Sequence, residues 1–119
     1  MHVLIVESDL ELGRLWQRHL ERSGKQVTLV HSQEEAVEQL SRRSFSILVL
    51  DALLEEGSPF AVADVAGYRW PDMKVVFVTR QSFFSDGSIF RHATNACAML
   101  SHDTLPEDLD AVLDHYGTS

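Results

Sequence analysis

The sequence predicts a doubly wound α/β fold, in which a five-stranded parallel sheet is covered by helices on both faces. Five short apolar runs alternate with stretches of helical periodicity, and four of the runs are rich in β-branched residues or leucine without in/out alternation. Strands of that kind must be covered on both faces. Because crossovers between parallel strands are right-handed, the alternation implies one sheet between two layers of helices.

Each of the five predicted strands is a short run of mostly apolar residues followed by a polar residue. They are VLIV at 3–6, VTLV at 27–30, ILVL at 47–50, VVFV at 75–78 and CAML at 97–100.

The intervening stretches carry apolar residues at helical spacing, so each should lay one stripe on the sheet. The clearest stripes are Leu12, Leu15, Trp16 and Leu20, then Ala36, Val37 and Leu40, then Leu105, Leu109, Val112 and Leu113. Helix starts are predicted at capping boxes and at a serine before a first-turn proline. These starts are Ser8 with Glu11, Ser32 with Glu35, Thr104 with Glu107, and Ser58 with Pro59.

Composition limits the function classes. The 119 residues fit one domain, 1–119, and a net charge of -8 with only two lysines opposes the phosphate attraction on which nucleic-acid binding depends. The single cysteine, Cys97, cannot form an internal disulfide, and no segment approaches the ~20 apolar residues that span a bilayer. We therefore expect a cytoplasmic protein that binds neither nucleic acid nor a membrane directly.

The polar residues that directly follow the apolar runs are the candidate site, because ligands of doubly wound folds bind outside the carboxyl ends of the strands. They are Glu7, Ser8 and Asp9 after the first run, Asp51 after the third, Thr79 and Arg80 after the fourth, and Ser101 and His102 after the fifth. Crowded carboxylates repel one another unless a cation neutralises them, so Mg²⁺ is a natural guest. A carboxylate held there can also act as a nucleophile toward a phosphoryl group.

These segments resemble the receiver domains of two-component response regulators over the whole chain. "VLIVESDLEL" is similar to the acidic start of a receiver, and "LVLDALLEEGSPF" to the phosphoacceptor segment with Asp51 as acceptor. "VVFVT" places Thr79 at the switch hydroxyl, and "LPEDL" resembles the entry to the last helix. The resemblance implies a flavodoxin-like sheet of order 2-1-3-4-5 and a signalling module rather than an enzyme. It also implies that a histidine kinase or phosphotransfer protein donates the phosphoryl group and that an output protein is a further partner. It leaves open whether the chain forms a homodimer.

The chain departs from the receiver pattern at four working positions. Ser8 stands in place of the second metal-binding acid, which leaves Glu7 and Asp51 as metal ligands and predicts weak Mg²⁺ binding. His102 stands where receivers carry a lysine that grips the phosphoryl group. Arg80 follows Thr79 where a small residue is usual, and its permanent charge is a candidate to compensate for that lysine. Met99 replaces a common aromatic switch residue.

Three function classes follow. The first is a receiver that accepts a phosphoryl group at Asp51 and switches a protein-interaction surface. The second is a pseudo-receiver that acts by protein contact without phosphorylation. The third, an unrelated α/β enzyme or cofactor binder, is disfavoured because "ESDLELG" lacks a glycine-rich phosphate loop and Leu53 removes the second acid of an Asp-x-Asp phosphohydrolase. A plain strand-end role for Asp51 is weaker than the acceptor role, because an unpaired acid beside Glu7 is costly without a function.

Overall fold

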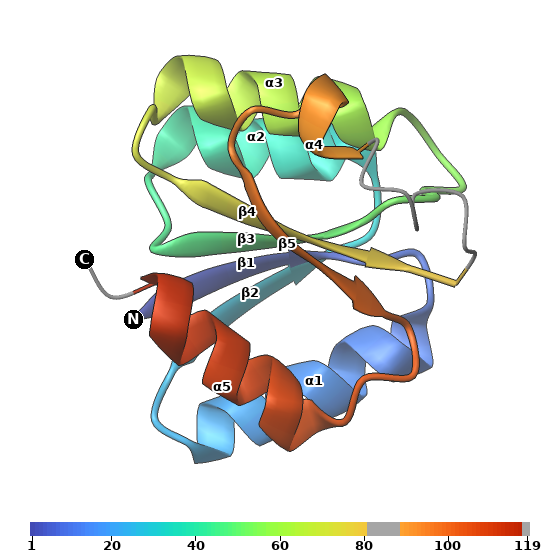
Figure 1. Cartoon of the computed structure of the whole chain (residues 1–119), viewed down its shortest axis with the longest axis vertical. Coiled ribbons are helices and arrows are strands. Elements are labelled where there is room, and N and C mark those ends of the chain that lie inside the picture. The colour runs from blue at the N-terminus through green and yellow to red at the C-terminus, as the bar shows by residue number, and fades with distance from the viewer. Residues whose placement is uncertain (81–88, 118–119) are drawn as a thin grey trace.

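The computed structural model describes residues 1–80 and 89–117, and within these ranges strands and helices alternate (Figure 1). The strands are β1 (His2–Val6), β2 (Gln26–Val30), β3 (Ile47–Asp51), β4 (Lys74–Thr79) and β5 (Ala96–Ser101). The helices are α1 (Leu10–Arg22), α2 (Gln33–Arg42), α3 (Pro59–Arg69), α4 (Ile89–His92) and α5 (Pro106–Gly117). Each strand contains the apolar run that predicted it. Helix α4 is a single turn.

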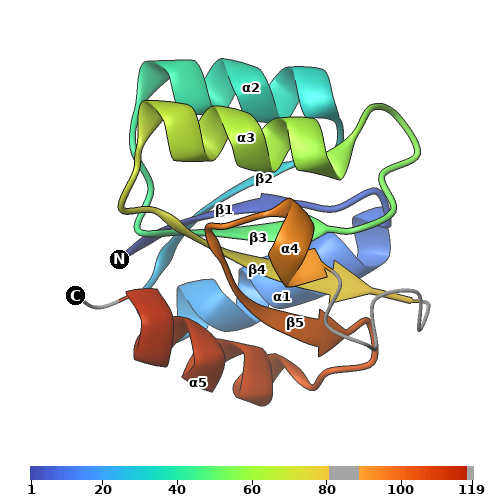
Figure 2. The ribbon, with the colours of Figure 1, turned by 45° about the horizontal axis from the view of Figure 1, so that its top comes forward.

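The strands form one parallel sheet in the order β2-β1-β3-β4-β5, which confirms the predicted doubly wound fold. Strand β1 lies between β2 and β3 and pairs with both in register, with Val3 opposite Val27 and Ile47. Helices α1 and α5 cover one face of the sheet and α2, α3 and α4 the other, as Figures 1 and 2 show. No helix in the described ranges is long and apolar enough to cross a membrane.

The core consists of two apolar layers, one on each face of the sheet. Alternate residues of a strand point to opposite faces, so Leu4 joins the layer under α2 and α3 while Ile5 joins the layer with Trp16 of α1. Both side chains are fully buried, which explains why β1 shows no polar alternation. The edge strands β2 and β5 are only partly buried, because each has a neighbour on one side alone.

Two predicted helix starts are confirmed and two are wrong. Ser32 caps α2 and Ser58 caps α3, where Pro59 occupies the first turn. Helix α1 is capped by Asp9 and not by Ser8, since the Asp9 carboxylate accepts the Leu12 N–H at 3.1 Å. Helix α5 begins at Pro106, two residues beyond the predicted cap at Thr104, because a proline is well suited to the first helical position.

Candidate functional site

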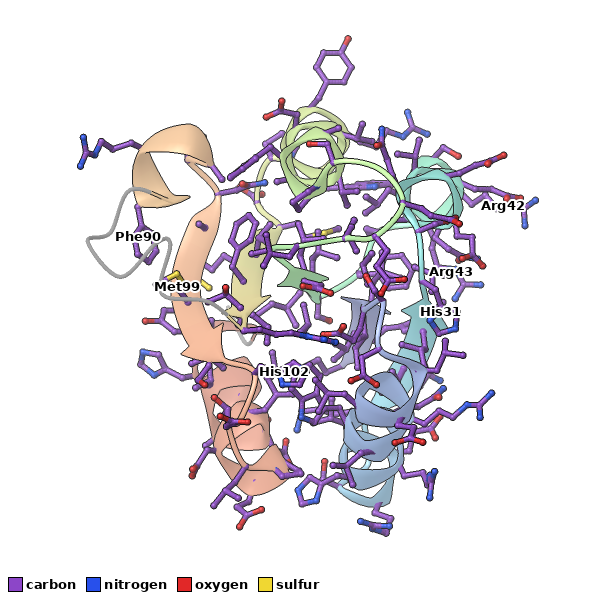
Figure 3. The ribbon with its side chains drawn as sticks, turned by 90° about the vertical axis from the view of Figure 1, so that its right-hand side faces the viewer. His31, Arg42, Arg43, Phe90, Met99 and His102 are labelled. Carbon is purple, nitrogen blue, oxygen red and sulfur yellow. The ribbon has the colours of Figure 1, made fainter. Side chains whose placement is uncertain are left out.

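The carboxyl edge of the sheet brings the predicted site residues together. Glu7 directly follows β1, Asp51 ends β3, and Thr79 ends β4 one position beyond the partner of Asp51. The His102 N–H donates to the Thr79 carbonyl at 2.9 Å, which extends the β4–β5 pairing past the strand ends. Figure 3 looks onto this edge, with His102 after β5 and His31 after β2 on opposite sides of it. The chemical roles of these residues stay predictions.

Asp51 is held at the base of the site by backbone donors. The residue is 4% exposed, and its carboxylate accepts the Leu53 N–H at 2.9 Å and the Ser8 N–H at 3.4 Å. The first bond ties the acid to its own loop, and the second ties it to the segment after β1. Asp51 therefore points from β3 toward Glu7 rather than into open solvent.

Glu7 is the second buried carboxyl of the site, at 1% exposure. One of its oxygens, Oε2, accepts the Asp9 N–H at 2.9 Å, while Oε1 is buried without a hydrogen-bond partner in the described residues. Burial, together with the neighbouring Asp51 carboxylate, raises the pKa of Glu7 from 4.5 to about 8. With a pKa of about 8, Glu7 is mostly protonated at neutral pH and therefore adds little negative charge to the site.

Ser8 fastens the loop that follows β3. Its hydroxyl accepts the Glu55 N–H at 3.1 Å, so the residue that replaces an acid performs a structural task. The same loop is fixed to α2, because the Ser58 N–H donates to the Gln33 side chain at 2.7 Å. Gly57 makes this approach possible, since it has a φ of 100° and a Cβ there would lie 2.3 Å from the Gln33 Cβ.

Three partly exposed side chains, those of Asp9, Arg80 and His102, form a rim beside the buried acids Glu7 and Asp51. The Arg80 guanidinium donates to Asp9 Oδ2 at 3.2 Å, and His102 Nε2 lies 3.7 Å from the same oxygen. Arg80 is also close enough to Glu7 to oppose the rise of the Glu7 pKa. The Arg80 side chain therefore reaches across the site to Asp9, with 45% of it exposed.

Sequence reasoning missed part of the role of Asp9 in the site. Its Oδ1 caps α1, and its Oδ2 also contacts Arg80 after β4 and His102 after β5. The signal that could have revealed this was its place in "ESD" directly after the first strand. The direction of an individual side chain is not encoded by spacing, so the ion pair itself required the structure.

The residues present fit a divalent cation poorly. In the described ranges no three His, Cys, Asp or Glu side chains form a group that could hold a metal ion. The raised pKa of Glu7 keeps it mostly protonated at neutral pH, while Asp9 contacts Arg80 and caps the start of α1. A hard cation prefers several ionised oxygens, and this site offers one negative charge at its base.

We expect Mg²⁺ to saturate Asp51 only well above ~1 mM, because affinity for hard cations follows ligand charge. Titration followed by the amide shifts of Ser8 and Leu53, the two donors to Asp51, measures it. The variant Ser8→Asp restores the missing charge and should bind Mg²⁺ more tightly, while Asp51→Asn should abolish the shifts. Submillimolar binding by the parent would contradict this expectation.

Comparisons with known proteins agree with the geometry. The response regulator receiver protein CpdR of Brucella abortus is 31% identical over 77 residues, which are 65% of this chain and 64% of that protein. The transcriptional regulatory protein YkoG of Bacillus subtilis is 34% identical over 53 residues, 44% of this chain and 23% of that protein. The chain thus spans less than two thirds of the length of either relative. No protein-family model matches the chain.

Among solved structures, a CheY-like receiver domain of Methanospirillum hungatei superposes with a TM-score of 0.89 at 20% identity. The alignment covers 98% of this chain and 92% of that one. The activated DrrB receiver domain gives 0.83 at 20% identity and covers 97% and 95% of the two chains.

The topology and the acids at the carboxyl edge define a doubly wound α/β domain of the flavodoxin-like type. The chain has this fold in common with receiver domains of response regulators, and over 77 residues its sequence is similar to the response regulator receiver protein CpdR.

Proposed function

We propose that this receiver accepts a phosphoryl group at Asp51 from a histidine kinase or a phosphotransfer protein. The observation that carries the proposal is the position of Asp51, at the carboxyl end of β3 and surrounded by Glu7, Thr79 and the Arg80 rim. In the proposed step an Asp51 oxygen attacks the phosphorus of a phosphohistidine, the P–N bond breaks, and the departing imidazole takes up a proton. The product is an acyl phosphate on Asp51.

Thr79 and Arg80 are the groups proposed to bind the transferred oxygens. Both lie at the end of β4, beside Asp51 on the neighbouring strand. A hydroxyl donates one hydrogen bond, and a guanidinium can donate two parallel bonds to phosphate oxygens. His102 adds a ring nitrogen from the far side and stands where other receivers have lysine.

Acceptance should be slow in this chain. Asp51 is buried, and a carboxylate that accepts a hydrogen bond from a protonated neighbour is a weaker nucleophile than a free one. The modification would shift a protein-interaction surface toward an output protein in the cytoplasm. The kinase and the output protein are partners implied by the family.

The second candidate is a pseudo-receiver that binds its partner without phosphorylation. The ion pair between Arg80 and Asp9 favours this function. Arg80 is the candidate to replace the missing lysine, and in the unmodified protein it is already paired with Asp9. A domain of this kind would present one constant surface.

Labelling with acetyl phosphate, read by intact mass, distinguishes the two functions. We expect one slow adduct on the parent and none on Asp51→Asn. Arg80→Ala should lower the labelling rate about tenfold or more, the scale of one charge-assisted hydrogen bond, and His102→Ala should lower it less. The control is Arg42→Ala, which removes an exposed arginine paired with Glu38 on α2.

An unlabelled parent would favour the pseudo-receiver and exclude Asp51 as an acceptor. Equal labelling of Arg80→Ala and Arg42→Ala would exclude Arg80 as the compensating cation.

A further inference from the structure

A cleft of about 360 Å³ opens at the amino-terminal edge of the sheet, opposite the edge that carries Asp51. Three segments form it: residues 44–46 before β3, residues 70–74 between α3 and β4, and residues 116–117 at the end of α5. In Figure 1 all three lie on the left, where β3 and β4 begin. The size of the cleft is that of a small-molecule site, and phosphoryl transfer uses none of these residues.

The interior of the cleft is apolar and held in place by the protein itself. Phe45 and Met73 are its most buried lining residues, at 5% and 4% exposure, and Trp70 and Tyr116 line it with partly exposed rings. The Trp70 indole N–H donates to the Leu40 carbonyl at 2.8 Å, which fixes the ring without a ligand. Apolar and aromatic surface that is already ordered binds an apolar group without a further ordering cost.

Two opposite charges line the same cleft and do not pair with each other. Asp72 and Lys74 are both exposed, and neither forms an ion pair within residues 1–80 and 89–117. The Lys74 ammonium lies 5.7 Å from the centre of the Tyr116 ring, which places it on the α5 side of the cleft. A ligand with a single charge would meet one attractive and one repulsive group there. A zwitterion matches both groups.

We propose that this cleft binds a free α-amino acid with a large apolar side chain. The carboxylate of the ligand pairs with Lys74, and its ammonium pairs with Asp72. Its side chain packs against Trp70 and Tyr116. The site lies at the opposite edge of the sheet from Asp51, so it is a second function of the domain and does not depend on phosphoryl transfer.

L-Phenylalanine is the probe, and the indole N–H signals of the two tryptophans report its binding in an NMR titration. We expect the Trp70 signal to shift to saturation while the Trp16 signal stays in place, because Trp16 is fully buried in the apolar layer on the other face of the sheet. Glycine, which lacks the apolar side chain, should leave both signals unchanged. A Trp70 signal that does not respond to phenylalanine would overturn the proposal.

Two analogues of phenylalanine test the charges separately. Hydrocinnamate lacks the ammonium and phenethylamine lacks the carboxylate, so each should bind about fivefold more weakly than phenylalanine, the upper scale of one exposed ion pair. Equal affinities for the three ligands would show that only the ring is bound and would overturn the zwitterion site.

Variants assign each charge to its residue. Lys74→Met should weaken phenylalanine about fivefold and leave phenethylamine unchanged, whereas Asp72→Asn should weaken phenylalanine and leave hydrocinnamate unchanged. Arg42→Ala and Asp103→Asn are the matched controls, because each removes an exposed charge away from the cleft. A variant that weakens all three ligands equally would indicate a distorted cleft and would overturn the assigned pairing. Asp51→Asn should bind phenylalanine like the parent, and a loss of binding there would contradict a site independent of phosphoryl transfer.

Discussion

Replacement of Lys25 by methionine should lower the free energy of unfolding at pH 7 by about 2 kcal/mol, although this lysine is far in sequence from its partners. Lys25 lies between α1 and β2 with its side chain 7% exposed, and its ammonium contacts Asp110 and, at 2.9 Å, Asp114 of α5. Methionine keeps the apolar stem but leaves the mostly buried Asp110 without its main partner. Urea denaturation followed by circular dichroism measures the loss.

The pH dependence of this loss has a defined sign. Burial opposes the charged forms, yet the hydrogen bonds between them outweigh it and lower the pKa of Asp110 while raising that of Lys25. A carboxyl with a depressed folded pKa stabilises the protein above its unfolded pKa, and this contribution is lost as the pH falls through the folded value. The parent and Lys25→Met should therefore converge in stability in acid, below about pH 4.

Lys74 supplies the control because it is the other lysine of the chain. It is exposed at the start of β4, where its ammonium lies 5.7 Å from the centre of the Tyr116 ring. Lys74→Met should cost less than about 1 kcal/mol, the scale of an exposed cation–π contact. Equal losses in the two variants would contradict a buried ion-pair role for Lys25.

The fold could be predicted from the sequence because a run of apolar residues without polar alternation indicates a strand that is buried on both faces. A strand such as ILVL at 47–50 has no polar side, so it had to be covered on both faces, and the structure confirms this. The strand order was implied by the resemblance and not by the runs. The sequence pattern gave the wrong N-cap for α1, because Ser8 and Asp9 are adjacent residues that both cap helices well.

The composition of the site was predictable, but its contacts were not. Parallel strands end at one edge, so Glu7, Asp51 and Thr79 had to lie close together. The sequence could not show that Arg80 turns toward Asp9, because a side-chain direction depends on the packing of the whole edge. It also could not show the pairing of Lys25 with Asp110, which are 85 residues apart.

The largest effect expected at the site is a gain of stability when Glu7 becomes glutamine. The folded pKa of Glu7, about 8, exceeds its unfolded value of 4.5, so the folded state holds an extra proton between these pH values. Stability therefore falls as the pH rises through this window and is lowest above pH 8. Glutamine removes the charge, and the variant should be more stable than the parent by roughly 3 kcal/mol at pH 9.

Chemical denaturation at pH 5, 7 and 9 measures this gain. The parent should lose stability across the series, while Glu7→Gln should change little, so the two proteins should be close at pH 5. Glu11→Gln is the matched control, because Glu11 is an exposed acid in the first turn of α1. A parent as insensitive to pH as Glu7→Gln would show that Glu7 is ionised in the folded protein at neutral pH.

Asp51→Asn separates the two causes of the shift. Burial of Glu7 remains in this variant, whereas the Asp51 carboxylate no longer accepts its proton or repels its charge. We expect the pH dependence of stability to shrink but not to vanish, since burial is the larger cause. A dependence that vanishes completely would assign the shift to the Asp51 charge. In that event a phosphoryl group on Asp51, which also carries negative charge, would keep Glu7 protonated and couple its proton to the modification.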